Sequence, residues 1–464
     1  MNARSLIKKF IPSGLFPAIE PYGHLAEAAV LNTLNGFPAR GIKVIGVTGT
    51  NGKTSTSYMI HRMLHEAGYK VGLMTTVAYG VGNDIHPQIH HMTNVGVPEL
   101  MKRLKWMKSQ GVEWLVLETT SHALAQNRVW GVPYSVAVMT NVTHEHLDYH
   151  KTFERYRDAK IKLFKLAAAN KHGLRLGVVN AEDPSAKKFM TAVPHAISYG
   201  VGKGSLSAAN VRATPQGSSF TATFDGSQDP GAHDVVFGGG VAKKDQAPRK
   251  LQLTVNIPGS FNISNALAAA STGIAIGLTD TQIEQGIAAL SGVEGRMTNI
   301  NEGQDYSVIV DFAHTPDSFE KLFKDLKPIV KGRLIVMFGS AGRRDEAKRA
   351  VQGKLAGTYA DAVVITEEDD RDIDGKAIMA QIAKGAEKAG KVRGINLFLV
   401  HDRTEAIAFT MSLAHKDDTV LLLGKGHEKT IERANGENPW DEIGAAHDAI
   451  KAQSAKKPHK TTRK

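Results

Sequence analysis

Residues 46–54 contain the feature that most constrains how this chain folds, a glycine-rich turn between an apolar segment and a predicted helix. Ile42–Ile45 is typical of a short buried strand, and a helix is predicted to begin at Thr54. The turn follows the pattern G-x-x-G-x-x-G-K-T, with Val47 where the commonest phosphate-binding loop has glycine. Glycines let the backbone wrap around phosphate oxygens, while helix N-terminal amides and Lys53 supply positive charge. The pattern predicts a nucleotide-phosphate site; a chance glycine turn is the alternative.

Length and composition limit the class of protein that contains this loop. A chain of 464 residues, 42% hydrophobic and 22% charged, is typical of a soluble enzyme with two or three domains. Because there is no cysteine, disulfides, thiolate catalysis and cysteine-ligated zinc are excluded. No stretch reaches the roughly 20 consecutive apolar residues of a membrane span, and no signal-peptide pattern is visible. We therefore expect a cytoplasmic protein without a membrane span.

The net charge of +11 raises the question of nucleic-acid binding. Much of that charge is local, because the tail after Ile450 contains six basic residues and no acidic one: Lys451, Lys456, Lys457, Lys460, Arg463 and Lys464. Such a tail is typical of a solvated chain end. Without a nucleic-acid-reading motif, we expect small-molecule substrates, no nucleic-acid partner and a monomer.

Alternating apolar strands and amphipathic helices predict an α/β fold with a mostly parallel sheet in a central domain, residues 42–297. Its predicted strands are 43–47, 114–118 and 134–140, and its predicted helices are 54–67, 98–110, 153–169, 263–276 and 279–290. Residues 203–258 are rich in Gly, Ser and Thr and have alternating stretches, which indicates hairpins or an insertion at the sheet edge.

A second strand–helix series predicts a smaller doubly wound domain over residues 298–450. Its predicted strands are 306–311, 334–338, 362–366, 397–401 and 419–423. Residues 1–41 form a short lead with four prolines, too small for a domain, and residues 451–464 are the basic tail.

Four polar patches follow predicted strand ends, where ligands bind in open α/β sheets. Besides the glycine-rich loop, they begin at Glu118, at Thr140 and at Asp311. Each alone has a plain explanation, since a carboxylate at a strand end often caps a helix and histidines are common in surface loops. Four such patches in one chain favour a functional site.

Lys160 is the residue whose predicted position is most unusual. On a helical wheel it shares one arc with Tyr156, Leu163 and Phe164, so it projects from the face meant for the interior. A bare ammonium there is costly, and its pKa falls on burial. A neutral amine can react with CO₂ to give a carbamate, an oxygen ligand suited to Mg²⁺. The alternative is a side chain whose end reaches solvent.

Taken together, these segments resemble the Mur ligases, and most of all the members that join a diamino acid to UDP-N-acetylmuramoyl-alanyl-glutamate. The resemblance covers about 42–430 in the right order. It rests on eight motifs: G-T-N-G-K-T (49–54), E-T-T-S-H-A-L (118–124), T-N-V-T-H-E-H-L-D-Y-H (140–150), A-K-x-K-L-F (159–164), G-S-F-N-I-S-N-A-L-A-A (259–269), G-R-M (295–297), D-F-A-H-T-P (311–316) and G-K-G-H-E (424–428).

The resemblance implies a central P-loop ATPase domain, a C-terminal Rossmann-like domain, and ATP-dependent amide ligation in peptidoglycan precursor synthesis through an acyl phosphate. The catalytic residues it implies are Lys53, Glu118, His146 and Lys160. The ATP-binding residues it implies are Gly49, Thr50, Asn51, Gly52, Lys53, Thr54, Asn265, Arg296 and Asp311. The Mg²⁺ ligands it implies are Thr54, Glu118, His146 and Lys160, the last as N6-carboxylysine.

The resemblance also implies a substrate site formed by Thr93, Thr120, Gln126, Arg128, His314, Arg344, Arg371, Gly424 and Glu428. The family's N-terminal uridine-binding domain has only 45 residues to correspond to it here. Three interpretations are open. Uridine recognition is reduced, the acceptor is not a UDP-sugar, or another subunit supplies the uridine-binding site.

The diamino acid stays open between diaminopimelate and lysine or ornithine. Arg371 provides a cation for the distal carboxylate of diaminopimelate. The acidic residues 367–370 could instead attract the ammonium of lysine or ornithine, or form a solvated loop. The alternative functions are a folylpolyglutamate-type ligase and a P-loop ATPase coupled to a partner.

Overall fold

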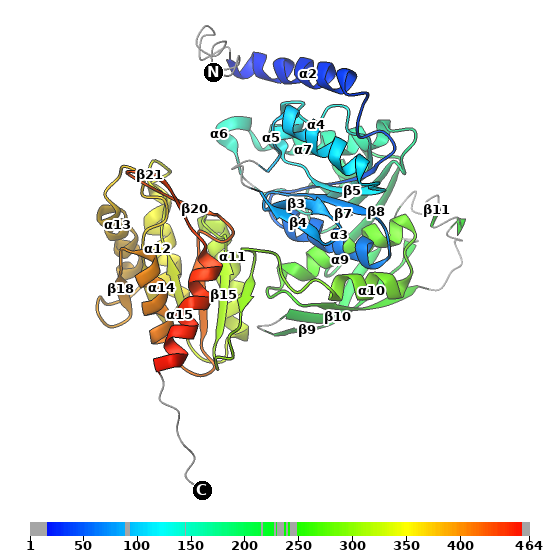
Figure 1. Cartoon of the computed structure of the whole chain (residues 1–464). Helices are drawn as coiled ribbons and strands as arrows, with labels where there is room; N and C mark the ends of the chain where they lie inside the picture. The colour runs from blue at the N-terminus through cyan, green and yellow to red at the C-terminus, as the bar shows by residue number, and fades with distance from the viewer. Residues whose placement is uncertain are drawn as a thin grey trace. The chain divides into compact units, whose positions relative to one another are not determined.

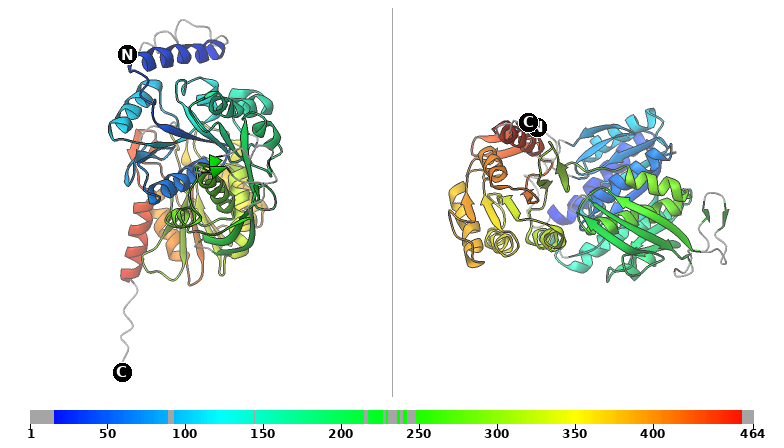
Figure 2. Two further views of the ribbon diagram at one scale, coloured as in Figure 1. Left: turned by 90° about the vertical axis from the view of Figure 1, so that its right-hand side faces the viewer. Right: turned by 90° about the horizontal axis from the view of Figure 1, so that it is seen from below.

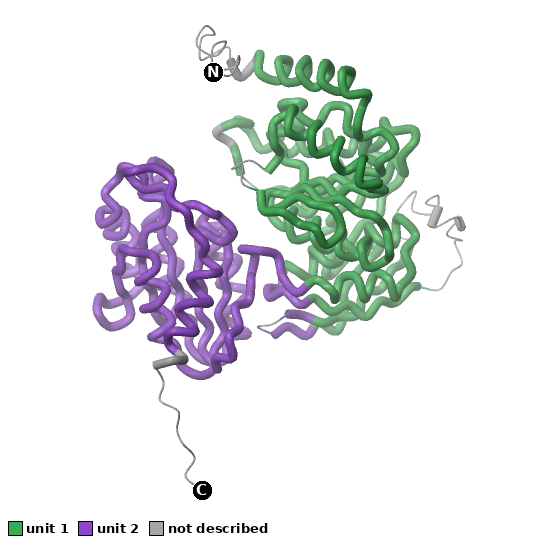
Figure 3. The backbone as a smooth tube through the Cα atoms, in the orientation of Figure 1, with its two compact units in different colours: residues 1–211, 219–255, 261–290 green, residues 212–218, 256–260, 291–464 purple. Residues whose placement is uncertain are grey.

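The computed structural model describes residues 16–88, 93–143, 145–214, 217–226, 229, 236–237, 240–241 and 248–456. The chain divides into two compact units, shown in Figure 3. The first unit comprises residues 1–211, 219–255 and 261–290, and the second comprises 212–218, 256–260 and 291–464. The predicted boundary near Met297 lies inside the second unit. Residues 1–15 of the lead and residues 457–464 of the basic tail lie outside the described residues.

The first unit is built on an 11-stranded sheet with the order β13-β10-β9-β8-β7-β6-β1-β5-β2-β3-β4. Its strands are β1 (Lys43–Thr48), β2 (Val71–Met74), β3 (Ala78–Val81), β4 (Asp84–Pro87), β5 (Trp114–Glu118), β6 (Tyr134–Met139), β7 (Leu176–Asn180), β8 (His195–Gly200), β9 (Leu206–Thr214), β10 (Gly217–Phe224) and β13 (Arg249–Val255). The central run from β8 to β2 is parallel, and it is almost wholly buried. The predicted parallel sheet is confirmed.

Helices cover both faces of this sheet (Figures 1 and 2). The helices are α2 (Phe16–Leu34), α3 (Lys53–Glu66), α4 (Val97–Ser109), α5 (Ser121–Ala125), α6 (Leu147–His150), α7 (Phe153–Ala169), α8 (Ala186–Met190), α9 (Phe261–Ile276) and α10 (Asp280–Ala288). Helices α4, α5 and α7 lie on one face, and α3, α9 and α10 lie on the other. The short pair β11 (Val236–Phe237) and β12 (Gly240–Val241) completes the unit.

Two segments refine the predictions for this unit. The Gly-, Ser- and Thr-rich stretch supplies β9, β10 and β13, which extend one edge of the sheet, as expected of an insertion there. The short lead contains a 19-residue helix, α2, for which no prediction was made. Among the residues described, no helix is both long and apolar enough to cross a bilayer.

The second unit has a six-stranded sheet with the order β14-β15-β19-β16-β17-β18. Its elements are β14 (Thr298–Ile300), β15 (Ser307–Asp311), α11 (Pro316–Leu326), η3 (Lys327–Ile329), β16 (Leu334–Phe338), α12 (Ala347–Tyr359), β17 (Ala362–Ile365), α13 (Gly375–Lys388), β18 (Leu397–Leu399), α14 (Arg403–Leu413), β19 (Thr419–Leu423), β20 (Thr430–Arg433), β21 (Gly436–Pro439) and α15 (Glu442–Lys456). All pairs from β15 to β18 are parallel. The predicted doubly wound fold is confirmed.

Candidate active site

The glycine-rich loop joins β1 to α3, and its glycines lie where no side chain fits. A Cβ atom at Gly49 would come within 1.8 Å of the Thr140 hydroxyl oxygen. At Gly52, where φ is +82°, a Cβ would come within 2.3 Å of Asn265 Oδ1. Within the described part of the chain no side chain caps the N-terminus of α3, and the Lys53 ammonium donates to Thr50 O at 2.7 Å. The loop is thus shaped to bring backbone amides and one cation to a bound anion.

Three predicted patches meet at the carboxyl edge of the sheet, because β6, β1 and β5 are adjacent and parallel. The Glu118 carboxylate at the end of β5 accepts the Thr54 hydroxyl at 2.9 Å. It also accepts the Thr76 backbone N–H and the Thr76 hydroxyl, each at 3.0 Å. The hydroxyls of Thr76 and Thr93 pair at 2.9 Å. Thr54 and Glu118 therefore present neighbouring oxygen atoms, the kind of ligand that Mg²⁺ prefers.

Lys160 is 2% exposed, so the prediction that it faces the interior is confirmed. Its ammonium donates to Gly49 O at 2.6 Å and lies 4.4 Å from the Tyr156 ring centroid. Burial lowers the pKa of Lys160 well below its ordinary value, and the charge of Lys53 acts in the same direction. A buried amine with a depressed pKa is poised to be neutral and nucleophilic.

His146 has a half-exposed side chain and lies in an aromatic cluster, not in a buried pocket. Its ring centroid is 4.8 Å from that of His122 and 6.1 Å from that of Tyr156. The Tyr156 hydroxyl pairs with the Thr50 hydroxyl at 3.0 Å. Through Tyr156, the histidines are connected to the phosphate loop and to Lys160.

The residues predicted around the muramoyl-peptide are also close together. Thr120 caps α5 and donates its hydroxyl and its N–H to Asn94 Oδ1 at 2.9 and 2.8 Å. Arg128 donates to Asn94 O at 2.5 Å. Gln126 donates to Glu20 Oε2 of α2 at 3.2 Å. Sequence reasoning missed Asn94 and Glu20, which organise these side chains from outside the recognised motifs.

In the second unit, Asp311 ends β15 and accepts the backbone N–H groups of Met297 and Ala313, each at 2.8 Å. Burial raises the pKa of Asp311, partly offset by the Arg296 charge. The Arg296 guanidinium lies 4.8 Å from the ring centroid of Phe312. The structure thus brings Asp311 and Arg296 together at the carboxyl edge of this sheet. Asn265 belongs to the first unit, where it lies against the glycine-rich loop.

The remaining predicted substrate residues of the second unit follow its strand ends. The ring nitrogen Nδ1 of His314 pairs with Phe312 O at 2.9 Å, and Arg344 is exposed. Gly424 has a φ of +105°, and burial raises the pKa of Glu428. Lys425 donates to Glu428 at 2.6 Å and to Asp369 at 2.9 Å.

The guanidinium of Arg371 is partly engaged within the protein. Its Nε donates to Glu432 Oε2 and its terminal nitrogen donates to Gly342 O, both at 2.6 Å. Glu432 lies in β20, which no recognised motif covers, so this pair could not be predicted from the motifs.

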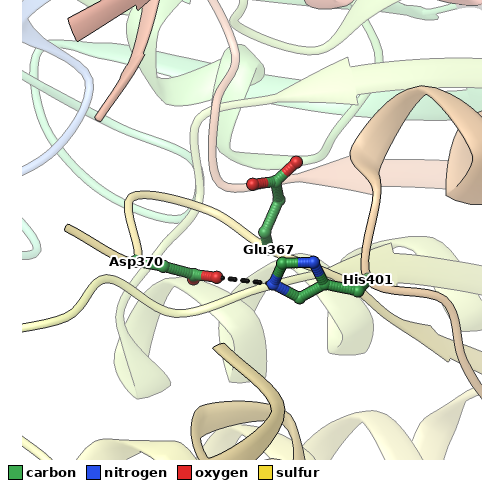
Figure 4. A group of neighbouring side chains, drawn as sticks. All are labelled: Glu367, Asp370 and His401. Atoms are coloured by element: carbon green, nitrogen blue, oxygen red, sulfur yellow. Dashed lines mark hydrogen bonds and ion pairs between the residues drawn. The ribbon is translucent and has the colours of Figure 1, made fainter. Parts of the chain in front are cut away.

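Glu367, Asp370 and His401 form a group whose ligand atoms are close enough for one cation (Figure 4). His401 Nε2 pairs with Asp370 Oδ2 at 2.9 Å. Both oxygens of Glu367, however, accept from the Arg433 guanidinium, at 2.9 and 2.6 Å. A metal ion here would have to displace Arg433, so the group is better described as an ion-pair network.

Comparisons with known proteins agree with this geometry. Residues 47–273 match the model of the Mur ligase middle domain, and residues 295–426 match that of the Mur ligase, glutamate ligase domain. The UDP-N-acetylmuramyl-tripeptide synthetase of Roseiflexus sp. (strain RS-1) is 39% identical over 450 residues, covering 94% of this chain and 84% of that protein. The UDP-N-acetylmuramoyl-L-alanyl-D-glutamate--2,6-diaminopimelate ligase of Alkaliphilus metalliredigens is 36% identical over 428 residues, covering 91% and 80%.

Among solved structures, a UDP-N-acetylmuramoyl-L-alanyl-D-glutamate--2,6-diaminopimelate ligase aligns with a TM-score of 0.62 and 28% identity. The alignment covers 89% of this chain and 79% of that one. The two units described here therefore have counterparts along most of a known enzyme chain.

Proposed function

The chain belongs to the Mur ligases, which are ATP-dependent, ADP-forming amide ligases, and we propose that it joins a diamino acid to UDP-N-acetylmuramoyl-L-alanyl-D-glutamate. The names of the relatives that match over more than nine-tenths of the chain support this acceptor. They also favour it over the folylpolyglutamate-type and partner-coupled alternatives. The reaction is a step of peptidoglycan precursor synthesis, placed in the cytoplasm and serving cell shape and division.

The carboxylate of the acceptor is a poor electrophile, so it must be activated before an amine can attack it. A carboxylate oxygen of the acceptor attacks the γ-phosphoryl group of ATP, giving an acyl phosphate and ADP. The amine of the amino acid then attacks the acyl carbon, the C–O bond to phosphate breaks, and phosphate leaves as the amide forms. In both steps negative charge develops on oxygen atoms of the reacting groups. Fixed cations and N–H donors stabilise this charge.

The phosphate loop fits the first step. We assign Gly49, Thr50, Asn51, Gly52, Lys53 and Thr54 to the ATP phosphates, because a Cβ would fill the hollow beside Gly49 or Gly52. Lys53 adds the positive charge that the transferring phosphoryl group requires. Asn265, Arg296 and Asp311 are assigned to the rest of the nucleotide.

Mg²⁺ would be held by Thr54 and Glu118, whose oxygens are 2.9 Å apart, with His146 and a modified Lys160 completing the sites. When bound, Mg²⁺ neutralises phosphate charge. We assign Lys160 as N6-carboxylysine: the neutral amine forms an N–C bond to CO₂ and releases one proton, leaving an anionic oxygen ligand. Its burial and depressed pKa support this assignment.

The substrate residues stay assigned as predicted. Thr93, Thr120, Gln126 and Arg128 would contact the muramoyl-peptide, and His314, Arg344, Arg371, Gly424 and Glu428 would surround the amino-acid site. Hydrogen bonds link Thr93 to Thr76 and, through Asn94, Thr120 to Arg128. A monomer remains the expectation.

The buried Lys160 beside the phosphate loop is the observation that carries the proposal, because a simple nucleotide-binding protein has no need of it. The test is purified protein with ATP, Mg²⁺ and UDP-N-acetylmuramoyl-L-alanyl-D-glutamate, offered lysine, ornithine and diaminopimelate in turn. ADP release that depends on the amino acid, with a product of the summed mass minus water, is expected. ADP release that responds only to a nucleic acid or protein would overturn it.

A further inference from the structure

The carboxyl edge of the second unit's sheet carries more carboxylates than cations. Segment 367–371 follows β17 and loop 424–428 follows β19, and both strands are parallel to β16 between them. Their carboxyl ends therefore meet at one edge, where ligands bind in such sheets. Among the described residues, the ion pairs at this edge are Arg433–Glu367, Arg371–Glu432, Arg403–Glu442, Lys425–Asp369, Lys425–Glu428 and His401–Asp370.

Glu368 is the carboxylate left over from this pairing. It is 6% exposed, and its Oε2 is buried without a hydrogen-bond partner among the described residues. Arg403 interacts electrostatically with Glu368, but its donors go to Glu442 and to the backbone oxygens of Glu367 and Leu423. A buried, unpaired carboxylate is costly to keep, which points to a missing cationic ligand.

Position 424, beside Glu368 Oε2, has room only for a glycine. A Cβ at that position would come within 2.8 Å of Oε2, and its φ of +105° is one that other residues rarely adopt. The Asp369 and Glu428 carboxylates share the single ammonium of Lys425 close by. A ligand group that enters here meets negative charge on several sides.

Arg371, by contrast, already has part of its guanidinium engaged. Its guanidinium holds Glu432 Oε2 and Gly342 O, both at 2.6 Å. Glu432 is itself fixed, because its backbone N–H donates to Asp369 Oδ1 at 2.9 Å. A cation that is already paired contributes little to binding another anion.

We propose that Glu368 receives the distal ammonium of the diamino acid, so that the substrate is of the lysine or ornithine class and not diaminopimelate. This inference rests on the proposed function. A distal carboxylate would add an anion beside Glu368, Asp369 and Glu428, and like charges at this range are strongly unfavourable. Exposed Arg344 is left for the α-carboxylate that all the candidates share.

The test compares kcat/KM for lysine, ornithine, norleucine and meso-diaminopimelate, with the full chain, ATP, Mg²⁺ and the UDP-muramoyl-dipeptide. Lysine or ornithine should exceed diaminopimelate and norleucine by about 100-fold or more, as expected for a site that pairs a buried polar group. Amide formation with diaminopimelate at equal or higher efficiency would overturn the inference and leave the proposed ligase function standing. No amide with any amino acid would overturn both.

Substitutions test the role of Glu368 independently of the residues around it. Glu368→Gln keeps the shape, so it should raise KM for lysine at least 10-fold, leave KM for ATP unchanged and abolish the preference for lysine over norleucine. Glu432→Gln should free Arg371 and raise kcat/KM for diaminopimelate. Glu387→Gln, which removes an exposed pair with Arg393, is the matched control and should change neither. An unaltered lysine preference in folded Glu368→Gln would contradict the assignment.

Discussion

The ammonium nitrogen of Lys160 lies 2.6 Å from the carbonyl oxygen of Gly49, although the two residues belong to α7 and to the loop after β1. This hydrogen bond places a buried amine against the backbone of the phosphate loop. Tyr156, one turn earlier on α7, reaches the same loop through the Thr50 hydroxyl. Helix α7 thus supports the loop and also carries the group proposed to become a carbamate.

Replacing Lys160 tests that role. We expect Lys160→Ala to lower kcat at least 100-fold, since a preorganised charged group at a phosphoryl-transfer site contributes about this much. Acetate or another small carboxylate should restore part of the activity by occupying the vacated space. The exposed Lys165→Ala on the same helix is the control and should retain full activity. Full activity in Lys160→Ala would exclude the carbamate.

Two glycines at the ends of α3 allow a matched test of the loop. Both have positive φ, +82° at Gly52 and +90° at Gly68, so alanine strains the backbone at either position by about 1–2 kcal/mol. Only Gly52→Ala also brings its Cβ to 2.3 Å from Asn265; nothing lies within 4 Å at Gly68. We expect Gly52→Ala to raise KM for ATP at least 10-fold. Gly68→Ala should lower stability but leave KM for ATP unchanged.

Much of the fold was predictable because its signals are local. Strands such as Trp114–Glu118 and Leu334–Phe338 are apolar runs, and helix Phe153–Ala169 has a clear period, so each coincides with its prediction. Helix α2 was not predicted, and its hydrogen bonds to residues 126, 127 and 130 are non-local.

The candidate site was predictable where motifs follow strand ends. The burial of Lys160 was predicted from a helical wheel, and the proximity of Thr54 and Glu118 was implied by the family resemblance. The pairing of Arg371 with Glu432 joins residues 61 positions apart through a hairpin. No periodicity or spacing in the sequence encodes such a contact. The pairing of Arg371 with Glu432 could therefore be found only in the structure.

The buried pair of Arg403 and Glu442 provides a prediction about stability. Both side chains are fully buried, and Arg403 also donates to Glu367 O and Leu423 O. Removing one partner leaves an unpaired buried charge, so Arg403→Met should destabilise the second unit by about 3–5 kcal/mol in chemical denaturation. The double variant Arg403→Met, Glu442→Gln should recover part of that loss. A double variant less stable than Arg403→Met would show that the pair does not act as a unit.

His61 on α3 predicts how stability depends on pH. Burial lowers the pKa of His61 from 6.5 to about 4, so between these values the unfolded chain binds a proton that the folded chain does not. Stability should therefore fall as the pH drops from about 6.5 towards 4, by about 2 kcal/mol between pH 7 and pH 5 from this residue alone. His61→Gln cannot take up the proton, so the difference in unfolding free energy between wild type and variant should shift by that amount in favour of the variant at pH 5. Parallel denaturation curves at both pH values measure it, and a constant difference would contradict the assigned pKa.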